Sequence, residues 1–258
     1  MYTAFQRYEA IPNRRNPVSA SMLRYMLDTR GSDPDALSYA LTDFQIIGHY
    51  AGLRLSEYAQ YSAKGITMTA DGSSPRGFLI SDFIFYGQNR AHIPQPSDRH
   101  LTPDLVFSSA IRFREQKNGD NGQIVPFAAN TVDTDMCPVR AMLRIRARAQ
   151  RLGVSSGAPI AVAKSSHKVV NLHEKQINSH IRRAAREVYG ITDRHELVRF
   201  TTHSTRVGAA VHLHLAGKDG PFIKTRLRCR SDPFLLYLRN VLELAVQHAT
   251  ALAGTVFT

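Results

Sequence analysis

Two Asn-Gly dipeptides near the middle of the chain place the strongest constraint on its fold. Asn118-Gly119 and Asn121-Gly122 lie between two strand-like runs, Asp104–Phe113 and Gln123–Phe127. Asn-Gly is a preferred sequence for tight turns because both residues tolerate positive φ. The sequence therefore predicts an antiparallel hairpin whose two strands are joined by Glu115–Gly122.

Helical patterns flank this hairpin on both sides. The run Gly77–Gly87 also has a β-rich pattern, Arg90–Pro103 contains three prolines and is predicted as a loop, and a Gly/Ser/Ala-rich turn follows Leu152. The expected helices run from Ser19 or Ser21 to about Asp28, from Asp35 to about Tyr50, over Leu53–Tyr61, from Cys137-Pro138 to about Leu152, from Leu172 to Tyr189 and from Ser204 to Ala216, with a short helix after Pro221 and a last one that carries Tyr237. Helices, a small antiparallel sheet and more helices predict an α+β fold that is mainly α-helical.

The charge of the chain indicates an anionic partner. The sequence has 33 Lys and Arg against 21 Asp and Glu, a formal net charge of +12. Arginines gather in dispersed clusters, Arg140–Arg151 and Arg182–Arg186, and the guanidinium group suits bidentate contacts to phosphate. Nucleic acid is therefore the first candidate partner, and a merely basic surface is the alternative.

Cysteine usage and hydropathy bear on the compartment. Cys137 and Cys229 are the two cysteines, too few for a disulfide framework or a zinc site, which fits a reducing environment. No apolar run approaches the roughly 20 residues that span a bilayer, and the N-terminus lacks the apolar core of a signal peptide. We expect an intracellular protein without a membrane partner, in a nucleus or in a bacterial cytoplasm.

The segment from Phe200 to Asn240 carries an ordered set of reactive side chains. His203 and Arg206 are three residues apart and share one face of a helix. Tyr237 follows Asp232-Pro233, a pair typical of a helix start, because Asp caps the helix and Pro fits its first position. A phenol presented in this way to a His and an Arg could attack a phosphodiester. The alternative for Tyr237 is a buried aromatic residue in an apolar helix.

Arg54 is a second candidate phosphate ligand, in the run GLRLSEYAQ. Guanidinium groups stabilise the charge on the non-bridging oxygens of a transferring phosphate. Glu57 lies one helical turn further on and is expected to hold Arg54 in place. Taken alone, this spacing is also that of an ordinary surface Arg–Glu pair.

The order Arg54, Lys117, His203, Arg206 and Tyr237 resembles the catalytic domain of the tyrosine recombinase, or phage integrase, family, and in particular the integrase-like proteins of mobile elements. The resemblance implies site-specific recombination or integration of DNA through a 3′-phosphotyrosyl intermediate on Tyr237, with no metal and no nucleotide cofactor. It implies that Arg54 and Arg206 stabilise the phosphate, that His203 moves the proton of the nucleophile, and that Lys117 protonates the departing 5′ oxygen.

The chain departs from the family pattern at Cys229, where the family usually has a His or Trp that donates to the phosphate. A thiol is a weak donor, so Arg228 or Arg230 is expected to substitute for it or to contact DNA. Arg112 and Arg114, near the hairpin, are further candidate contacts to the DNA backbone. Cys229 as the nucleophile is a competing idea, although phosphodiester cleavage by a thiol would be unusual and no separate base is evident.

The resemblance covers residues 16–240. We expect residues 1–17 to form a leader or linker and residues 18–258 to form the recombinase-like catalytic domain, without the N-terminal helical domain of the family. The implied partners are duplex DNA and further copies of the chain, four in a recombining complex. Three alternatives stay open: a weakened or inactive DNA-binding relic of the same fold, DNA relaxation like that of type IB topoisomerases, and a general nucleic-acid-binding protein.

Overall fold

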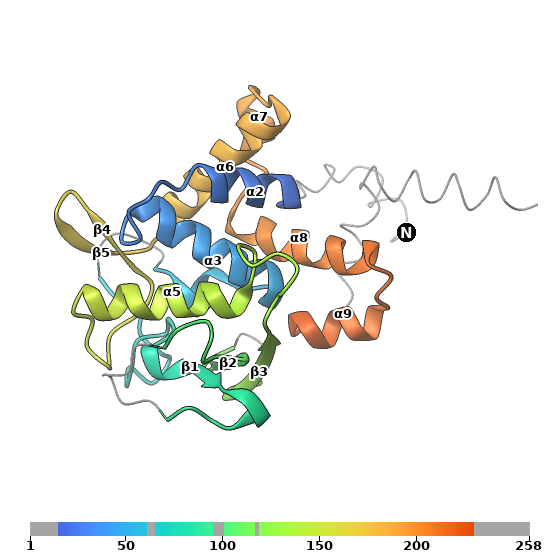
Figure 1. Ribbon diagram of the computed structural model, residues 1–258. Helices are drawn as coiled ribbons and strands as arrows, with labels where there is room; N and C mark the ends of the chain where they lie inside the picture. The colour runs from blue at the N-terminus through green and yellow to red at the C-terminus, as the bar shows by residue number, and fades with distance from the viewer. Residues whose placement is uncertain (1–14, 61–64, 95–100, 117–118, 230–258) are drawn as a thin grey trace, which may run out of the picture.

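The computed structural model describes residues 15–60, 65–94, 101–116 and 119–229, and it has an α+β fold that is mainly helical (Figure 1). The predicted fold class is confirmed at this level. The helices are α2 (Ala20–Asp28), α3 (Leu37–Ala51), α4 (Leu55–Tyr58), α5 (Pro138–Arg151), α6 (Glu174–Tyr189), α7 (Arg194–Leu197), α8 (Thr202–Leu215) and α9 (Gly220–Leu227), with short 3-10 turns η1 (Ile80–Asp82) and η2 (Gln88–Arg90). The strands are β1 (Phe83–Tyr86), β2 (Ser108–Phe113), β3 (Gln123–Ala128), β4 (Val162–Ser165) and β5 (Lys168–Asn171).

The elements are stacked around α3. From the antiparallel sheet β1-β2-β3, the layers continue through α5 and α3 to α2 and α6, and α8 packs on α3 from the side (Figure 1). α3 contacts α2, α5, α6 and α8, and it is buried around most of its circumference. A helix without a polar face requires such a central position.

The polar residues of α3 are paired inside the core. Asp43 accepts hydrogen bonds from Arg144 Nε at 2.6 Å and from Arg148 Nη2 at 2.5 Å, and both arginines lie on α5. Arg151 forms an ion pair with Asp35 just before α3. Arg144 and Arg148 therefore join α5 to α3, and Arg151 joins α5 to the segment before α3. This differs from the expectation that the cluster faces phosphate, because the paired aspartates are far away in the sequence.

The predicted hairpin and most predicted helices are confirmed. β2 and β3 pair in antiparallel register, with Ser108 opposite Ala128 and Phe113 opposite Gln123. Ser19 caps α2 by accepting from the backbone N–H of Met22 at 3.2 Å, and α6 ends at Gly190.

Several expected boundaries are wrong. In the described part of the expected helix Leu53–Tyr61, which ends at Gln60, only Leu55–Tyr58 is helical, because Gln60 forms a bridge to His173 instead. In the β-rich run Gly77–Gly87 the strand is limited to Phe83–Tyr86 and follows a 3-10 turn. The β4–β5 hairpin and α7 were not anticipated. The expected helix that carries Tyr237 lies outside the described residues.

α8 is held in a close approach to the segment that precedes α2. The backbone N–H of Val18 donates to the carbonyl of Ser204 at 3.0 Å. A Cβ atom on Gly208 would overlap the carbonyl oxygen of Val18. The glycine that follows the His203–Arg206 pair is therefore required by packing.

We expect Gly208→Ala to lower the free energy of unfolding by about 3 kcal/mol, since an overpacked contact must push α8 away from Val18. Gly157→Ala is the matched control, because a Cβ atom there meets no heavy atom within 4 Å. Urea denaturation of the two variants measures the difference. Equal stability of both variants would contradict the close approach.

Candidate active site

Arg54 stands where α3 ends and α4 begins. Gly52 terminates α3 in the left-handed conformation, with φ of 57°, and a Cβ atom on it would also press on the Leu227 side chain. Arg54 is then the N-cap of α4, and the buried Glu57 carboxylate accepts its backbone N–H at 2.8 Å and its Nη1 at 2.9 Å. The expectation that Glu57 holds Arg54 is confirmed.

Arg206 reaches the same place from the buried face of α8. Its Nη1 donates to the carbonyl of Gly52 at 2.5 Å. Its Nη2 lies 3.4 Å from the carbonyl oxygen of Arg228, and Nη2 of Arg54 donates to the same oxygen at 3.0 Å. Two guanidinium groups that are far apart in the sequence therefore converge on one acceptor.

Arg228 adds a third guanidinium group, which is buried deeper in the protein than that of Arg54. It is 4% exposed, and it donates to the Glu57 carboxylate through Nη1 at 3.3 Å and Nη2 at 3.0 Å. The group also lies 3.4 Å from the centre of the Phe113 ring. The side chain thus points into the protein, which differs from the expected contact to DNA, and the buried Glu57 is the reason.

The cluster carries an excess of positive charge. Arg54, Arg206 and Arg228 share one carboxylate, that of Glu57. Burial lowers the pKa of Arg206, and burial together with the neighbouring Arg206 and Arg54 lowers the pKa of Arg228 to about 10, against the opposing effect of Glu57. Arg206 and Arg228 stay charged at neutral pH despite these shifts, so the cluster favours an anion beside it.

His203 lies one turn before Arg206, at the start of α8. Its side chain keeps contact with solvent, yet loss of hydration lowers its pKa to about 4, with further lowering by Arg206, Arg15 and Arg54. The imidazole is therefore neutral at pH 7 and able to accept a proton. Arg15, which donates to the carbonyl of Val198 at 3.3 Å, is a member of this group that the sequence analysis missed.

Cys229 is half-buried at the edge of the cluster. Its Sγ accepts a hydrogen bond from Arg206 Nη2 at 2.9 Å. The structure therefore brings the residue that departs from the family pattern next to the convergent arginines. Its thiol takes up one donor of Arg206, whereas a His or Trp would add a donor.

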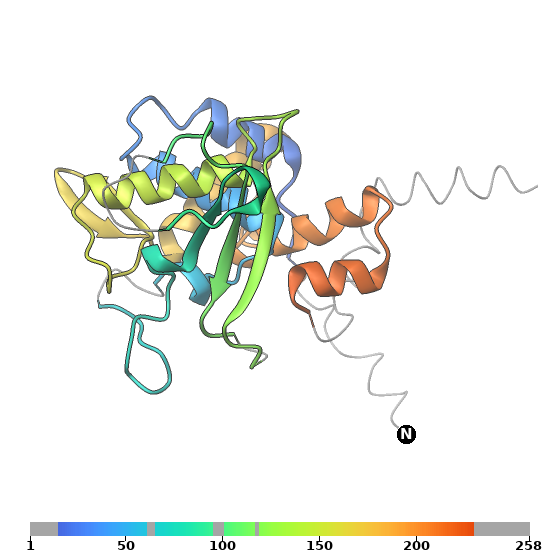
Figure 2. The same ribbon diagram turned by 60° about the horizontal axis from the view of Figure 1, so that its bottom comes forward.

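The β2–β3 hairpin approaches the cluster through Phe113, at the end of β2 next to the turn. Helix α9 lies beside these strands (Figure 2). The Arg228 guanidinium group lies over the ring of Phe113 at the end of β2, and that of Arg226 on α9 lies 4.6 Å from the centre of the Phe127 ring on β3. Lys117 follows Phe113 by four positions, but its own placement lies outside the described residues, as do those of Arg230 and Tyr237.

The two other candidate DNA contacts of this region differ from each other. Arg112 is exposed on β2, as expected for a contact to DNA. Arg114 is engaged internally: Nε donates to Asp82 at 2.7 Å, and the remaining nitrogens donate to Ser74 and to the carbonyls of Pro75 and Gly77. Arg114 therefore stabilises the loop before β1 and does not fit the expected DNA contact.

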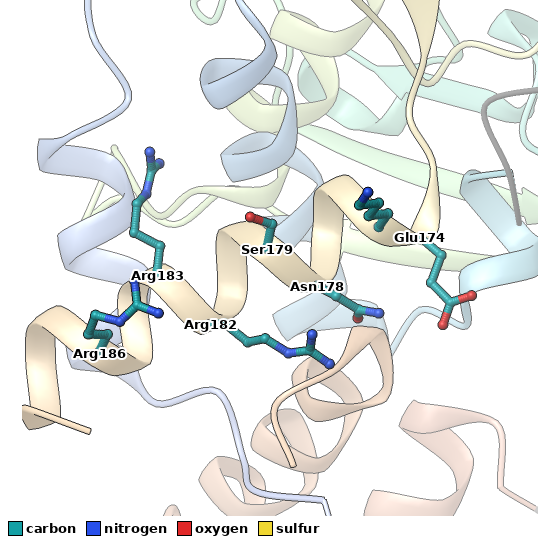
Figure 3. Close-up of a pocket in the computed structure, with 7 residues that line it drawn as sticks. Glu174, Asn178, Ser179, Arg182, Arg183 and Arg186 are labelled. Atoms are coloured by element: carbon teal, nitrogen blue, oxygen red, sulfur yellow. The ribbon is translucent and has the colours of Figure 1, made fainter. Parts of the chain in front are cut away.

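Helix α6, which lies next to the start of α8, has a basic surface. Figure 3 shows Asn178 and Arg182 on one side of the helix and Ser179 and Arg183 on the other, around a surface hollow. Asn178 Oδ1 accepts from the backbone N–H of Thr202 at 2.8 Å, and Arg182 Nε donates to the carbonyl of Phe200 at 3.0 Å. α6 thus holds the start of α8, on which His203 lies.

The remaining cations of α6 face solvent. Lys175, Arg183 and Arg186 are exposed, and they make no ion pair with a carboxylate in the described part of the chain. The apolar side of the helix is buried through Ile177 and Ile181. This amphipathic pattern was visible in the sequence, but the contact of Asn178 with α8 had no local signal.

His212 packs on His49 of α3, with 3.3 Å between the two Nδ1 atoms. Across the described ranges, no three His, Cys, Asp or Glu side chains are grouped so that they could hold a metal ion. No helix among the described residues has both the length and the apolar character to cross a membrane.

Comparison with known proteins adds no relative: the sequence matches no protein-family model and no curated protein.

We expect the Cε1 proton of His203 to titrate with a pKa of about 4, below the ordinary histidine value of about 6.5. Arg206→Gln should raise this pKa more than Arg54→Gln, because Arg206 is the larger of the two electrostatic contributions. NMR titration of the three proteins tests the order. A wild-type pKa near 6.5 would contradict the placement of His203 beside the cluster.

Proposed function

We propose that the chain is a site-specific DNA recombinase or integrase that cleaves and rejoins DNA through a 3′-phosphotyrosyl intermediate on Tyr237. The observation that supports this proposal most is the convergence of Arg54 and Arg206 on one oxygen atom. The pair lies beside a histidine that is neutral at pH 7. An excess of buried guanidinium groups at one point suits the oxygens of a phosphodiester.

In this proposal the Tyr237 phenol attacks the phosphorus atom and the bond to the 5′ oxygen breaks. Neutral His203 accepts the phenolic proton, and Lys117 gives a proton to the departing 5′ oxygen. Arg54 and Arg206 stabilise the charge that develops on the non-bridging oxygens. The phosphotyrosyl ester preserves the energy of the phosphodiester, so rejoining requires neither a nucleotide cofactor nor a metal. A single cleavage and religation would give relaxation of the type IB topoisomerase kind.

A weakened or inactive DNA-binding protein of the same fold is the second candidate. The contact of Cys229 with Arg206 favours it, because a thiol that accepts from Arg206 supplies no donor to the phosphate. Loss of one preorganised donor lowers the rate of such reactions by about 10²- to 10³-fold. The two candidates share DNA binding and differ in the covalent step.

The exposed cations of α6 are the proposed contact to the DNA backbone beside the reaction site. Lys175, Arg183 and Arg186 are exposed on α6, the helix whose Asn178 contacts the start of α8. Cations without a carboxylate partner are free to replace the counterions of DNA phosphates. Bound duplex would then extend from α6 across His203, with further copies of the chain on the neighbouring half-site.

We expect wild-type protein to form a covalent adduct with a nicked suicide DNA substrate, and Tyr237→Phe to bind the same DNA without an adduct. The phenylalanine keeps the aromatic ring and removes only the nucleophilic oxygen. Denaturing gel electrophoresis of labelled DNA measures the adduct. Tyr189→Phe, at an exposed tyrosine of α6, is the matched control and should retain it.

The outcomes of this experiment separate the candidates. An adduct that persists in Tyr237→Phe would sink the assignment of the nucleophile. DNA binding without an adduct in the wild type favours the inactive relic, and absence of DNA binding rejects both candidates.

DNA affinity should fall steeply with salt, and the double variant Lys175→Gln/Arg186→Gln should lower the slope of log K against log salt by about 1 for each lost phosphate contact. Arg24→Gln/Arg151→Gln removes the same charge from exposed arginines that are already ion-paired, and should leave the slope nearly unchanged. Fluorescence anisotropy at several salt concentrations measures both. Equal slopes for the two double variants would exclude α6 from the DNA contact.

A further inference from the structure

We propose that Arg228 is a positioning residue that sets the geometry of Arg54 and Arg206 for the phosphate, through its guanidinium group on one side and its own carbonyl on the other. This inference rests on the proposed phosphodiester chemistry of the site. The observations that carry it are the backbone conformation of Arg228, its contacts with Glu57 and Phe113, and the two hydrogen bonds that its carbonyl accepts.

The backbone of Arg228 is in a conformation that favours glycine. It is the C-cap of α9, with φ of 56° and ψ of 49°. For a residue with a side chain, the left-handed region costs roughly 1–2 kcal/mol. Such a conformation persists where surrounding contacts determine it. At Arg228 these contacts are the hydrogen bonds of its side chain to Glu57, its position over Phe113 and the backbone hydrogen bond from Cys229 N to the carbonyl of Lys224.

The guanidinium group of Arg228 fixes the carboxylate that orients Arg54. Each oxygen of Glu57 accepts from both arginines: Oε1 from Nη1 of Arg54 and Nη1 of Arg228, Oε2 from the Arg54 backbone and Nη2 of Arg228. The planar guanidinium fork of Arg228, together with Nη1 and the backbone N–H of Arg54, thereby locks the carboxylate in one orientation. Arg228 acts on Arg54 through Glu57 and does not itself reach outward.

The carbonyl of Arg228 orients the two outer arginines directly. Arg54 Nη2 and Arg206 Nη2 lie 3.0 and 3.4 Å from this oxygen. A non-bridging phosphate oxygen is an acceptor of the same kind with a full charge. The donors therefore already converge without DNA, and a bound phosphate would take over the hydrogen bonds of the carbonyl. Donors that are oriented in advance need no reorganisation during the reaction.

Phe113 connects the same residue to the hairpin. The Arg228 guanidinium lies over its ring at 3.4 Å, and Phe113 is the last residue of β2. The hydrogen bond from Gly122 N to the carbonyl of Phe113, at 2.8 Å, closes the hairpin connection there. Arg228 therefore also fixes the base of the connection that contains Lys117.

The first test compares Arg228→Lys with Arg148→Lys. Both substitutions keep the positive charge and remove a buried guanidinium group. Arg148 is the control because it binds Asp43 in the contact between α3 and α5, away from the site. We expect Arg228→Lys to lower the single-turnover cleavage rate by about 10²-fold, since a small misplacement of reacting groups has that effect. The Kd for DNA should change by less than about threefold, because the loss appears in the transition state. Arg148→Lys should lose thermal stability and keep the wild-type rate.

A second variant controls for the possibility that Arg228→Lys impairs folding. Arg228→Gly suits the left-handed backbone and removes the side chain, so the variant should fold and cleave slowly. Added ethylguanidinium should restore part of the rate by occupying the space between Glu57 and Phe113. A purely structural role predicts a wild-type rate for the folded fraction and no response to ethylguanidinium, and this result would overturn the proposal.

The third measurement does not require cleavage. Arg228-Cys229 is the only Arg-Cys dipeptide in the chain. Labelling Arg with ¹³C at the carbonyl and Cys with ¹⁵N therefore gives a single carbonyl–amide NMR signal. We expect this ¹³C resonance to shift when inorganic phosphate, or duplex DNA with the Tyr237→Phe protein, replaces the carbonyl at the two arginines. The Arg54→Gln protein should show a smaller shift.

The two proposals fail in distinguishable ways. A protein that forms no adduct, but whose Arg228 resonance responds to phosphate, rejects the proposed enzyme and supports the positioning role. A protein that forms the adduct at the wild-type rate after Arg228→Lys, with an unshifted resonance, supports the enzyme and overturns the role of Arg228.

Discussion

The candidate site depends on the buried carboxylate of Glu57. Arg54 and Arg228 both bind this carboxylate, and Arg206 lies within reach of its charge. Without Glu57, three guanidinium groups would repel one another in a poorly hydrated space, where such repulsion is weakly screened. With it, the cluster is stable enough to form and still retains excess positive charge. One carboxylate among three guanidinium groups thus gives both the geometry and the electrostatics of an anion site.

The ends of helices bring these side chains together. α3 stops at Gly52, whose left-handed conformation turns the chain so that Arg54 begins α4 and the Gly52 carbonyl accepts from Arg206. α8 can lie close enough to α3 because Gly48 leaves room for Thr205. Contacts within the core therefore determine the separation of Arg54 and Arg206. Their convergence is a property of the packing of α3 against α8.

Local signals predicted local structure well and long-range partners poorly. Cys137-Pro138 correctly predicted the start of α5, and the Asn-Gly pairs correctly predicted the β2–β3 hairpin. Both predictions succeeded because helix caps and turns depend on neighbouring residues in the sequence. The link between Arg54 and Glu57 was predictable for the same reason. Arg114 and Arg228 were expected at a DNA surface, yet both are bound internally, because their carboxylate partners are distant in the sequence. The strands β4 and β5 have four residues each, and this short hairpin was not predicted from the sequence.

The two arginine populations of the chain have different physical consequences. Exposed cations such as those of α6 attract nucleic acid at little cost to stability, and they would serve any DNA-binding protein. Arg206 and Arg228 are desolvated, which destabilises the fold unless something compensates their charge. Glu57 compensates only part of it. Affinity for a DNA backbone alone does not require this arrangement, whereas stabilisation of a phosphate that gains charge in a transition state does. The buried cluster is therefore the physical basis on which we propose a phosphoryl-transfer enzyme ahead of an inert DNA-binding protein.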